Sequence, residues 1–272
     1  MTFDNFQIYY SLTGNRDKPL ILFLHGFMGD SHEFNEAIAL LSDQFSCLTV
    51  DLPGHGKTRV LGGDEYYTMP KTAQALINLL DWLDIKKCFL VGYSMGGRLA
   101  LYLALHFPQR FSKVVLESAS PGLETQWDQL ERIKRDFALA QQLEKTDFPS
   151  FLSNWYNQSL FTSIKKHPDF EYLIASRLNN NPSELAKSLR NMSTGCQPAL
   201  WEKLKQNTIP LLLLVGEYDA KFRSINSKMA RLCESAKVEI VSNCGHNIHF
   251  ENTKTFVENV RLFLNNLNIN QL

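Results

Sequence analysis

Short apolar runs, each closed by turn-forming or small polar residues, recur along the chain. Six are continuously apolar, which is typical of strands buried on both faces of a parallel sheet, and they cover residues 19–26, 45–54, 87–94, 113–122, 209–219 and 237–245. The stretch 6–13 is expected to add an antiparallel edge strand. The pattern therefore predicts a sheet built mainly from buried parallel strands.

Helical patterns lie between most of these strands. Apolar positions recur with helical spacing at 32–43, 69–83, 95–107, 223–233 and 252–267. Alternation of strands and helices predicts an α/β fold with a mostly parallel, doubly wound sheet. The tail from residue 265 onward is expected to fray.

One segment interrupts this alternation. Residues 123–200 hold helical patterns rich in Trp, Tyr, Phe and Arg and no buried strand. We therefore divide the chain into a core of residues 1–122 and 201–272 and a helical cap of residues 123–200 inserted between core strands. Such a cap is expected over the carboxyl edge of the sheet, where ligands bind in open α/β folds. The alternative is an extra helical layer with no site beneath it.

Composition and charge narrow the class of partner. Lys and Arg together number 28, as do Asp and Glu, so no global field favours nucleic acid or an anionic membrane. The apolar runs fall short of the roughly 20 residues of a membrane helix, and the first residues do not resemble a signal peptide. The five scattered cysteines form no C-x-x-C pair, which favours a reduced compartment. We expect a cytoplasmic protein with a small-molecule ligand, no nucleic-acid partner and no membrane insertion. A monomer is favoured, although no pattern identifies an interface.

A serine stands where a predicted strand passes into a predicted helix. The residues Gly92-Tyr93-Ser94-Met95-Gly96 follow the G-x-S-x-G pattern of a nucleophile elbow. Its glycines permit a sharp turn that exposes the serine hydroxyl at the positive end of the helix. The alternative is a structural turn serine.

A serine hydroxyl needs a general base that is itself oriented by a carboxylate. In this architecture the chain order is serine, acid, histidine, and the sequence meets it with Ser94, Asp219 and His246. Each follows the carboxyl end of a predicted strand, so the three side chains are expected to converge at one edge of the sheet.

Three other residues compete for these roles. Glu217 lies closer to its strand and should point elsewhere, Asp51 precedes Ser94 in the chain, and His249 falls later in the loop or on the next helix. His246 and His249 have the spacing of a metal-binding pair, but no Cys or carboxylate cluster completes a site. We expect neither a metal nor a cofactor.

Backbone donors for an oxyanion are expected beside the serine. The N–H of Met95 would provide one donor, and the N–H of Phe27, in the loop after the first long strand, would provide the other. Gly26 lets the backbone turn toward the site at that point. Such donors stabilise a developing negative charge on a substrate oxygen.

Arg98 follows Ser94 by one helical turn. Helix side chains lean toward the N-terminus, so the guanidinium can reach the catalytic mouth. Guanidinium groups bind carboxylates in a bidentate manner, which an esterase for neutral substrates does not need. The alternative is a structural pairing of Arg98 with a buried acid.

Several sequence blocks resemble a known family. "HGF", "DLPGHG", "GYSMGG" and "GHNIHFEN" are similar to the α/β-hydrolase superfamily. "GYSMGGRLAL", "ASPGL", "NWYNQSLF" with "ASRLNNN", and "GEYDAKF" resemble the 2-succinyl-6-hydroxy-2,4-cyclohexadiene-1-carboxylate synthases of menaquinone and phylloquinone biosynthesis. The resemblance spans about residues 19–265 and is weakest through 123–150. Ala220 departs from the pattern, which has Ser there.

The resemblance implies a lyase that eliminates pyruvate from a substrate with three carboxylates. It implies that Ser94 acts as a base toward a substrate carbon, and that the pocket includes five substrate-binding residues: Arg98, Arg132, Arg177, Tyr93 and Trp155. From the residues alone, Arg132 lies on a solvated helix face, and Trp155 could serve only to pack the cap on the core.

Two other functions remain open at this stage. A hydrolase of carboxylated esters or of carbon–carbon bonds would use the same triad, because substrate position decides between elimination and attack. A non-catalytic ligand receptor would have no need for all three triad residues.

Overall fold

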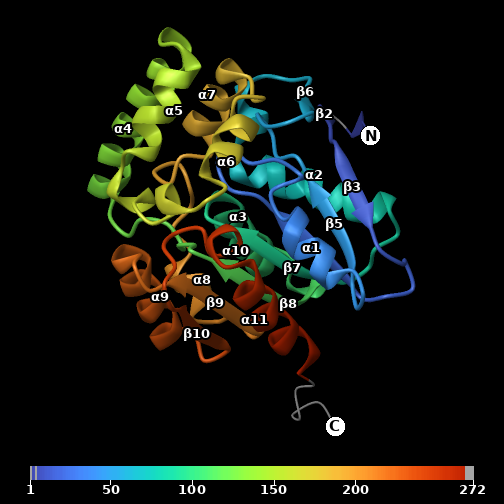
Figure 1. Ribbon diagram of the computed structural model, residues 1–272. Helices are drawn as coiled ribbons and strands as arrows, with labels where there is room; N and C mark the ends of the chain where they lie inside the picture. Colours follow the sequence, from blue (N-terminus) through green and yellow to red (C-terminus); the bar gives the residue numbers. More distant parts are fainter. Residues whose placement is uncertain (1, 4, 267–272) are drawn as a thin grey trace.

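The computed structural model describes residues 2, 3 and 5–266, and a seven-stranded sheet crosses the centre of this part of the chain (Figure 1). The strand order is β10-β9-β8-β7-β4-β5-β3, and neighbouring strands are parallel except for β3 and β5. This confirms the mostly parallel α/β sheet. Its strands are β3 (Tyr10–Thr13), β4 (Leu20–Leu24), β5 (Ser46–Val50), β7 (Cys88–Tyr93), β8 (Phe111–Glu117), β9 (Leu211–Gly216) and β10 (Ala236–Val241).

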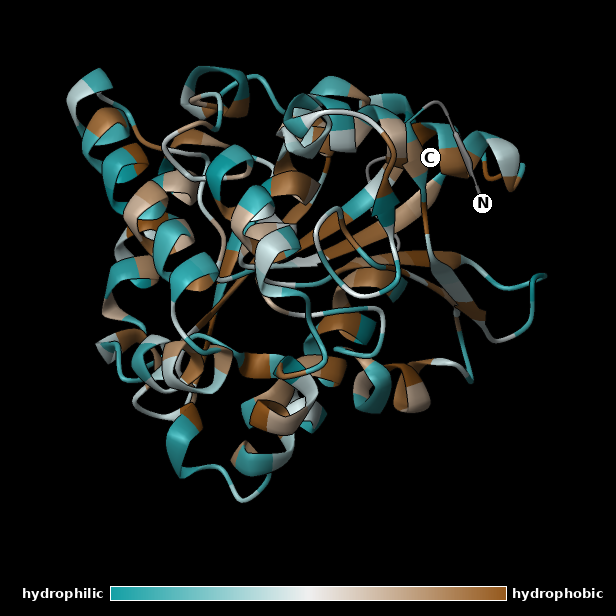
Figure 2. Ribbon diagram, turned by 90° about the horizontal axis from the view of Figure 1, so that it is seen from above, coloured by the Kyte–Doolittle hydropathy of each residue, from teal (hydrophilic) through white to brown (hydrophobic). Residues whose placement is uncertain are grey.

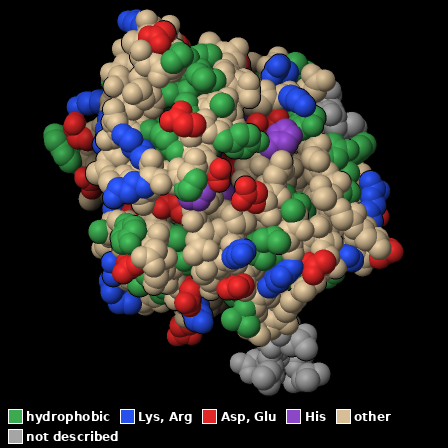
Figure 3. All heavy atoms as spheres, in the orientation of Figure 1, with side chains coloured by type: hydrophobic (Ala, Val, Ile, Leu, Met, Phe, Trp, Pro, Cys, Tyr) green, Lys and Arg blue, Asp and Glu red, His purple; other side chains and the backbone are tan. Residues whose placement is uncertain are grey.

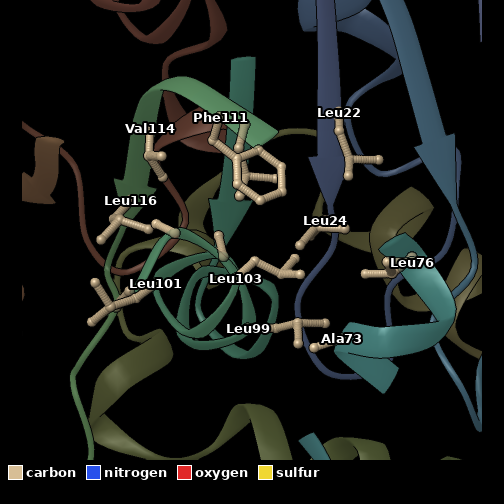
Figure 4. Packing of buried hydrophobic residues seen from close by; sticks show 14 of the residues in the cluster. Leu22, Leu24, Ala73, Leu76, Leu99, Leu101, Leu103, Phe111, Val114 and Leu116 are labelled. Atoms are coloured by element: carbon tan, nitrogen blue, oxygen red, sulfur yellow. The ribbon is translucent and has the colours of Figure 1, made fainter. Parts of the chain in front are cut away.

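Strand side chains alternate between two hydrophobic clusters, one on each face of the sheet. Leu22 and Leu24 of β4 join the first cluster, whereas Ile21 and Phe23 join the second. Figure 4 shows the first cluster between the strands and the helices that cover it, and Figure 2 shows how hydrophobic residues concentrate on the strands. Both faces are therefore buried, which explains why the strands read as continuous apolar runs.

Helices from different parts of the chain cover the two clusters. The first cluster includes residues of α2 (Met69–Trp82), α3 (Met95–His106), α8 (Trp201–Leu204) and α9 (Ala220–Leu232). The second includes residues of α1 (Asn35–Leu41), α10 (Ile248–Glu251) and α11 (Thr253–Asn265). The five predicted helices correspond to α1, α2, α3, α9 and α11. The expected fraying of the tail falls mostly on residues 267–272, which lie outside the described residues.

The predicted first strand is divided between two sheets. β3 is the antiparallel edge strand that was expected, but β2 (Phe6–Gln7) belongs to a small sheet with β1 (Thr2–Phe3) and β6 (Arg59–Val60). The chain crosses between the sheets at Tyr9, whose N–H donates to Thr58 Oγ1 over 2.9 Å. A single strand over 6–13 was therefore wrong.

The last strand also differs from expectation. β10 is present and parallel, but Lys237 and Ile240 are exposed on it. It lies at the edge of the sheet, where the covering layers end, so the prediction of burial on both faces was wrong for this strand.

The segment between β8 and β9 consists of helices and their connections, with no strand among its residues 123–200. It contains α4 (Gln126–Lys145), α5 (Phe148–Tyr156), α6 (Phe170–Arg177) and α7 (Pro182–Asn191), and these helices contribute most of a third hydrophobic cluster, which also includes Met28. Figure 1 shows α4 to α7 together on one side of the sheet. The 3-10 helices η3 (Ser159–Phe161) and η4 (Ile164–Lys166) also lie in this segment, and η1 (Asp64–Tyr67) and η2 (Pro108–Arg110) lie before it in the described chain. The division into core and cap stays a prediction.

Two further sequence expectations concern whole-chain properties. All five cysteines are free thiols. No helix in the described ranges is both long enough and apolar enough to cross a bilayer.

Candidate active site

Ser94 lies at a sharp turn between β7 and α3. Its backbone has φ of 49° and ψ of −105°, a conformation that residues with side chains seldom adopt. Gly96 makes the turn possible, because a Cβ there would lie 2.2 Å from the carbonyl oxygen of Leu24. The Ser94 N–H donates to the carbonyl of Glu117 on β8 over 2.9 Å, which fixes the turn to the sheet.

The structure brings Ser94, His246 and Asp219 together. His246 Nε2 lies 3.0 Å from Ser94 Oγ, and His246 Nδ1 lies 2.6 Å from Asp219 Oδ2. The other carboxylate oxygen of Asp219 accepts the N–H of Phe222 over 3.2 Å and so caps α9. The acid is therefore fixed by a helix terminus and orients the imidazole toward the serine.

The competing residues are engaged elsewhere. Glu217 is exposed and accepts the N–H of Asn243 over 2.9 Å. Asp51 is buried and accepts the backbone N–H groups of Ser31 and Lys57, each over 2.6 Å. His249 Nδ1 lies 2.8 Å from Glu117 Oε2, away from Ser94. The hydrogen bond of Ser94 Oγ is therefore to His246 and not to any of these three residues.

The two imidazoles with metal-pair spacing both face carboxylates instead of sharing a ligand position. Among the residues that the structure describes, no group of three or more His, Cys, Asp or Glu side chains could hold a metal ion.

The expected oxyanion donors border the same cavity as Ser94. Met95 is the first residue of α3, so its N–H has no carbonyl within that helix to bond. Phe27 lines the cavity beside it. A Cβ at Gly26 would lie 2.5 Å from the ring of Tyr93, so only glycine allows this approach of loop and elbow. The Gly26 N–H itself donates to Glu33 over 3.0 Å.

A cavity of about 950 Å³ opens between the triad and the helical segment. Ser94, Asp219 and His246 form part of its wall, and residues of α4, α5 and α7 form another part. All ten residues predicted for the site line this cavity. A volume of this size accommodates a small organic ligand.

Arg98 enters the cavity without a carboxylate partner among the described residues. Its guanidinium donates to Gln197 Oε1 over 2.9 Å and to the carbonyl of Met192 over 2.8 Å. Burial, together with repulsion from Arg132, lowers the pKa of Arg98 to about 10, so the group is still protonated at neutral pH. Arg98 forms no ion pair with a buried acid, which was the structural alternative, and its hydrogen-bond partners are neutral, although the nearby carboxylate of Asp136 partly offsets the lowering of its pKa.

Arg132 and Arg177 already have acidic partners. Arg132 Nε lies 2.8 Å from both carboxylate oxygens of Asp136, one turn later on α4. Arg177 is buried and bonds to the buried carboxylate of Glu33. Burial by itself would lower the pKa of Arg177, but the Glu33 carboxylate and Tyr156 hold that pKa above its ordinary value. The residues alone suggest that Arg132 lies on a solvated helix face. Its side chain is indeed partly exposed, but it also borders the cavity.

The two aromatic residues differ in their surroundings. Tyr93 is buried, and its ring centroid lies 5.5 Å from that of His246 and 4.9 Å from that of His249. Burial raises the pKa of Tyr93 well above its ordinary value. Trp155 packs against Phe27 at 5.2 Å, which joins the helical segment to the core. Trp155 therefore has the packing contact as well as a place in the cavity wall.

Four residues near the site were not among the predictions. Lys221 lies in the cavity wall two residues after Asp219, within the quoted block "GEYDAKF". Gln197 bonds Arg98, and Glu33 and Glu117 bond Arg177 and His249. For Gln197, Glu33 and Glu117 the sequence carries no local signal, because each partner lies far away along the chain.

Comparison with known proteins gives the family. The family model for the alpha/beta hydrolase fold matches residues 19–253. A Bacillus subtilis protein named putative 2-succinyl-6-hydroxy-2,4-cyclohexadiene-1-carboxylate synthase is 37% identical over 256 residues, covering 93% of both chains. An Escherichia coli O1:K1 protein with the same name, without "putative", is 35% identical and covers 88% of this chain and 91% of its own. The chain belongs to this synthase family within the α/β hydrolases.

A solved structure supports the same assignment. MenH from S. aureus superposes with a TM-score of 0.88 at 36% identity and covers 96% of this chain and 98% of its own. The sequence resemblance to the synthase family and the prediction of an enzyme on an α/β-hydrolase fold are thus confirmed.

Proposed function

We propose that the chain eliminates pyruvate from 2-succinyl-5-enolpyruvyl-6-hydroxy-3-cyclohexene-1-carboxylate and forms 2-succinyl-6-hydroxy-2,4-cyclohexadiene-1-carboxylate. The family supports this assignment. The observation that carries it is Arg98, a cationic group one helical turn from Ser94 that faces the cavity with only neutral partners. A substrate carboxylate would supply the direct ion-pair partner that Arg98 lacks among the described residues.

In this proposal the triad acts as a base. Ser94 Oγ passes its proton to His246 Nε2 and removes a proton from a ring carbon of the substrate. The C–H electron pair forms a double bond between C2 and C3, the existing C3–C4 double bond shifts to C4–C5, and the C5–O bond to the enolpyruvyl group breaks. The leaving enolate takes up a proton, which the His246 imidazolium can return, to become pyruvate. Asp219 stabilises the imidazolium that forms on His246. No water adds and no acyl-enzyme forms.

The proposed carboxylate-binding groups divide into two classes. Arg98 and Lys221 form no ion pair with any residue of the described chain and would bind substrate directly, whereas Arg132 would share its charge with Asp136. Arg177 is held by Glu33, so we assign it to the cavity wall with Tyr93 and Trp155. The N–H groups of Phe27 and Met95 would hold the oxygen on which charge develops.

Electrostatics fit a small anionic ligand more than a macromolecule. Acidic and basic side chains are interspersed over the face that Figure 3 shows, in keeping with equal numbers of both in the chain. The cavity wall itself contains the basic side chains Arg98, Arg132 and Lys221, which are available to a small anion.

Hydrolysis is the second candidate, because the 3.0 Å contact of His246 with Ser94 equally suits attack on a carbonyl. Intact-mass spectrometry of the protein during turnover of the enolpyruvyl substrate separates the two. Elimination leaves the protein mass unchanged at every time point. A transient adduct on Ser94 would support the hydrolase and contradict the proposed reaction.

Lys221 provides a separate test of carboxylate recognition. Lys221 is exposed overall, but partial desolvation of its ammonium group and the nearby Arg132 lower its pKa, and it lines the same cavity as the arginines. We expect Lys221→Gln to raise KM about fivefold with little change in kcat. A fivefold change corresponds to ~1 kcal/mol, which is the free energy of a partly exposed ion pair. Steady-state kinetics of pyruvate release measure both constants.

Lys254→Gln is the matched control, because Lys254 is likewise an exposed lysine at the second position of a 13-residue helix, and it does not line the cavity. The control should behave as wild type. Equal KM values in all three proteins would remove Lys221 from the binding site.

A further inference from the structure

Three ionisable side chains next to the triad are buried and take no part in the proposed chemistry. Glu117, the last residue of β8, is fully buried, and His249 and the carboxylate of Glu33 are nearly so. Burial of charged groups is costly unless hydrogen bonds compensate for the lost water. The contacts of Glu117 therefore show which parts of the structure its burial stabilises.

Glu117 contacts both the turn that carries Ser94 and the segment that follows His246. Through its backbone carbonyl it accepts the N–H of Ser94 over 2.9 Å. Through its side chain it accepts the N–H groups of Ile248 and His249 at Oε1, over 2.6 and 3.1 Å. Its other oxygen, Oε2, lies 2.8 Å from His249 Nδ1. One residue of the central sheet thus fixes the serine turn and the segment just after His246.

The two backbone donors are available because they begin a helix. Ile248 and His249 open the four-residue helix α10, so their N–H groups have no carbonyl within that helix. A carboxylate at this position satisfies both donors and the imidazole of His249 together. From the exposed side, Glu251 accepts the N–H groups of Gly245 and Asn247 over 3.0 and 3.3 Å. The loop is therefore held from both sides, and Glu117 supplies the contact with the sheet.

We propose that Glu117 is a positioning residue for the base His246. It touches neither substrate nor reacting atoms, and it acts through the main chain of residues 248–249 and through the ring of His249. Release of this contact would let His246 move relative to Ser94 and Asp219, and a shift of about 1 Å in such a group lowers turnover by about 100-fold. The kinetic part of this inference rests on the proposed function.

Two substitutions at Glu117 distinguish the loss of its hydrogen bonds from an effect of the substitution itself. Glu117→Ala removes both acceptor oxygens. Glu117→Gln keeps one oxygen for the two backbone donors, and its NH₂ can donate to His249 Nδ1 after a tautomer change that places the ring proton on Nε2. That nitrogen has no hydrogen-bond partner among the described residues and lies 3.9 Å from Glu33 Oε1, so the tautomer change breaks no existing hydrogen bond at Nε2 and places the N–H toward a carboxylate. Glutamine is therefore the conservative variant.

Val115→Ala is the matched control. Val115 lies two residues earlier on β8, is fully buried, and makes only hydrophobic contacts on the same side of the strand. The Val115→Ala substitution removes buried side-chain volume but leaves the hydrogen bonds of Glu117 to residues 248–249 in place. Thermal unfolding of each variant establishes which proteins are folded at the assay temperature.

The test combines kinetics of pyruvate release with hydrogen exchange of the peptide containing residues 245–250. We expect Glu117→Ala to lower kcat about 100-fold with KM changed less than about threefold, and to speed exchange in this peptide. Glu117→Gln should keep kcat within about fivefold of wild type and retain protection, and Val115→Ala should match wild type in both. Rescue by glutamine distinguishes positioning from general destabilisation.

Two results would overturn the inference: unchanged exchange and kcat in folded Glu117→Ala, or an equal loss of kcat in Val115→Ala. A wild-type protein that releases no pyruvate would instead contradict the proposed function. In that case hydrogen exchange still decides whether Glu117 holds the loop, since that measurement needs no substrate.

Discussion

Ser94→Ala is expected to reduce pyruvate release by about three orders of magnitude or more, because triad residues act as a unit. The Ser94 side chain bonds His246, and its backbone N–H bond to Glu117 does not depend on the hydroxyl. The variant should therefore fold as wild type and still bind substrate. Stopped-flow or coupled assays give the rate, and tryptophan fluorescence or calorimetry gives binding.

Ser120→Ala is the control for this experiment. Ser120 is a second serine in the cavity wall, and its hydroxyl has no part in the proposed proton transfer. This variant should retain nearly wild-type turnover. A rate near wild type in Ser94→Ala itself would refute the serine as base and would leave only a binding role for the turn.

Arg98→Ala is expected to lose about 2–5 kcal/mol of transition-state binding, the scale for removal of one partner of a buried charge pair. The loss should appear in kcat/KM, measured per folded molecule. Arg98→Lys keeps the charge but not the fork of donors that reaches both Gln197 and Met192, so it should recover only part of the activity.

Arg110→Ala controls for loss of a half-buried arginine. Arg110 donates to the carbonyls of Ile85 and Lys86 and pairs with Asp81, outside the cavity wall. It should lose stability and keep kcat/KM. If Arg98→Ala behaved in the same way, with normal kcat/KM in the folded fraction, its role would be structural.

The sequence predicts the central layer of this fold well, because strands buried on both faces need continuous apolar runs and parallel strands need helical connections. The strand 6–13 was harder, since the hydrogen bond from Tyr9 to Thr58 that diverts it joins residues 49 positions apart. β10 shows the complementary error, because an apolar pattern does not reveal that a strand lies at the edge.

The site residues also divide into those that a local sequence pattern predicts and those that depend on contacts between distant parts of the chain. Ser94, Asp219 and His246 could be predicted because chain order and strand ends fix their place. The partners of the arginines could be predicted only in part. Arg132 and Asp136 have the four-residue spacing of a helical ion pair, whereas Glu33 lies 144 positions from Arg177. Long-range charge pairing depends on the folded chain, so the sequence alone does not distinguish a free arginine from a neutralised one.

The measurement that tests the central claim most directly is pyruvate release by the purified protein, with the enolpyruvyl substrate generated in situ. We expect release far above the spontaneous background, with one pyruvate formed per molecule of 2-succinyl-6-hydroxy-2,4-cyclohexadiene-1-carboxylate. Release at the background rate, from a protein that binds the substrate, would contradict that claim.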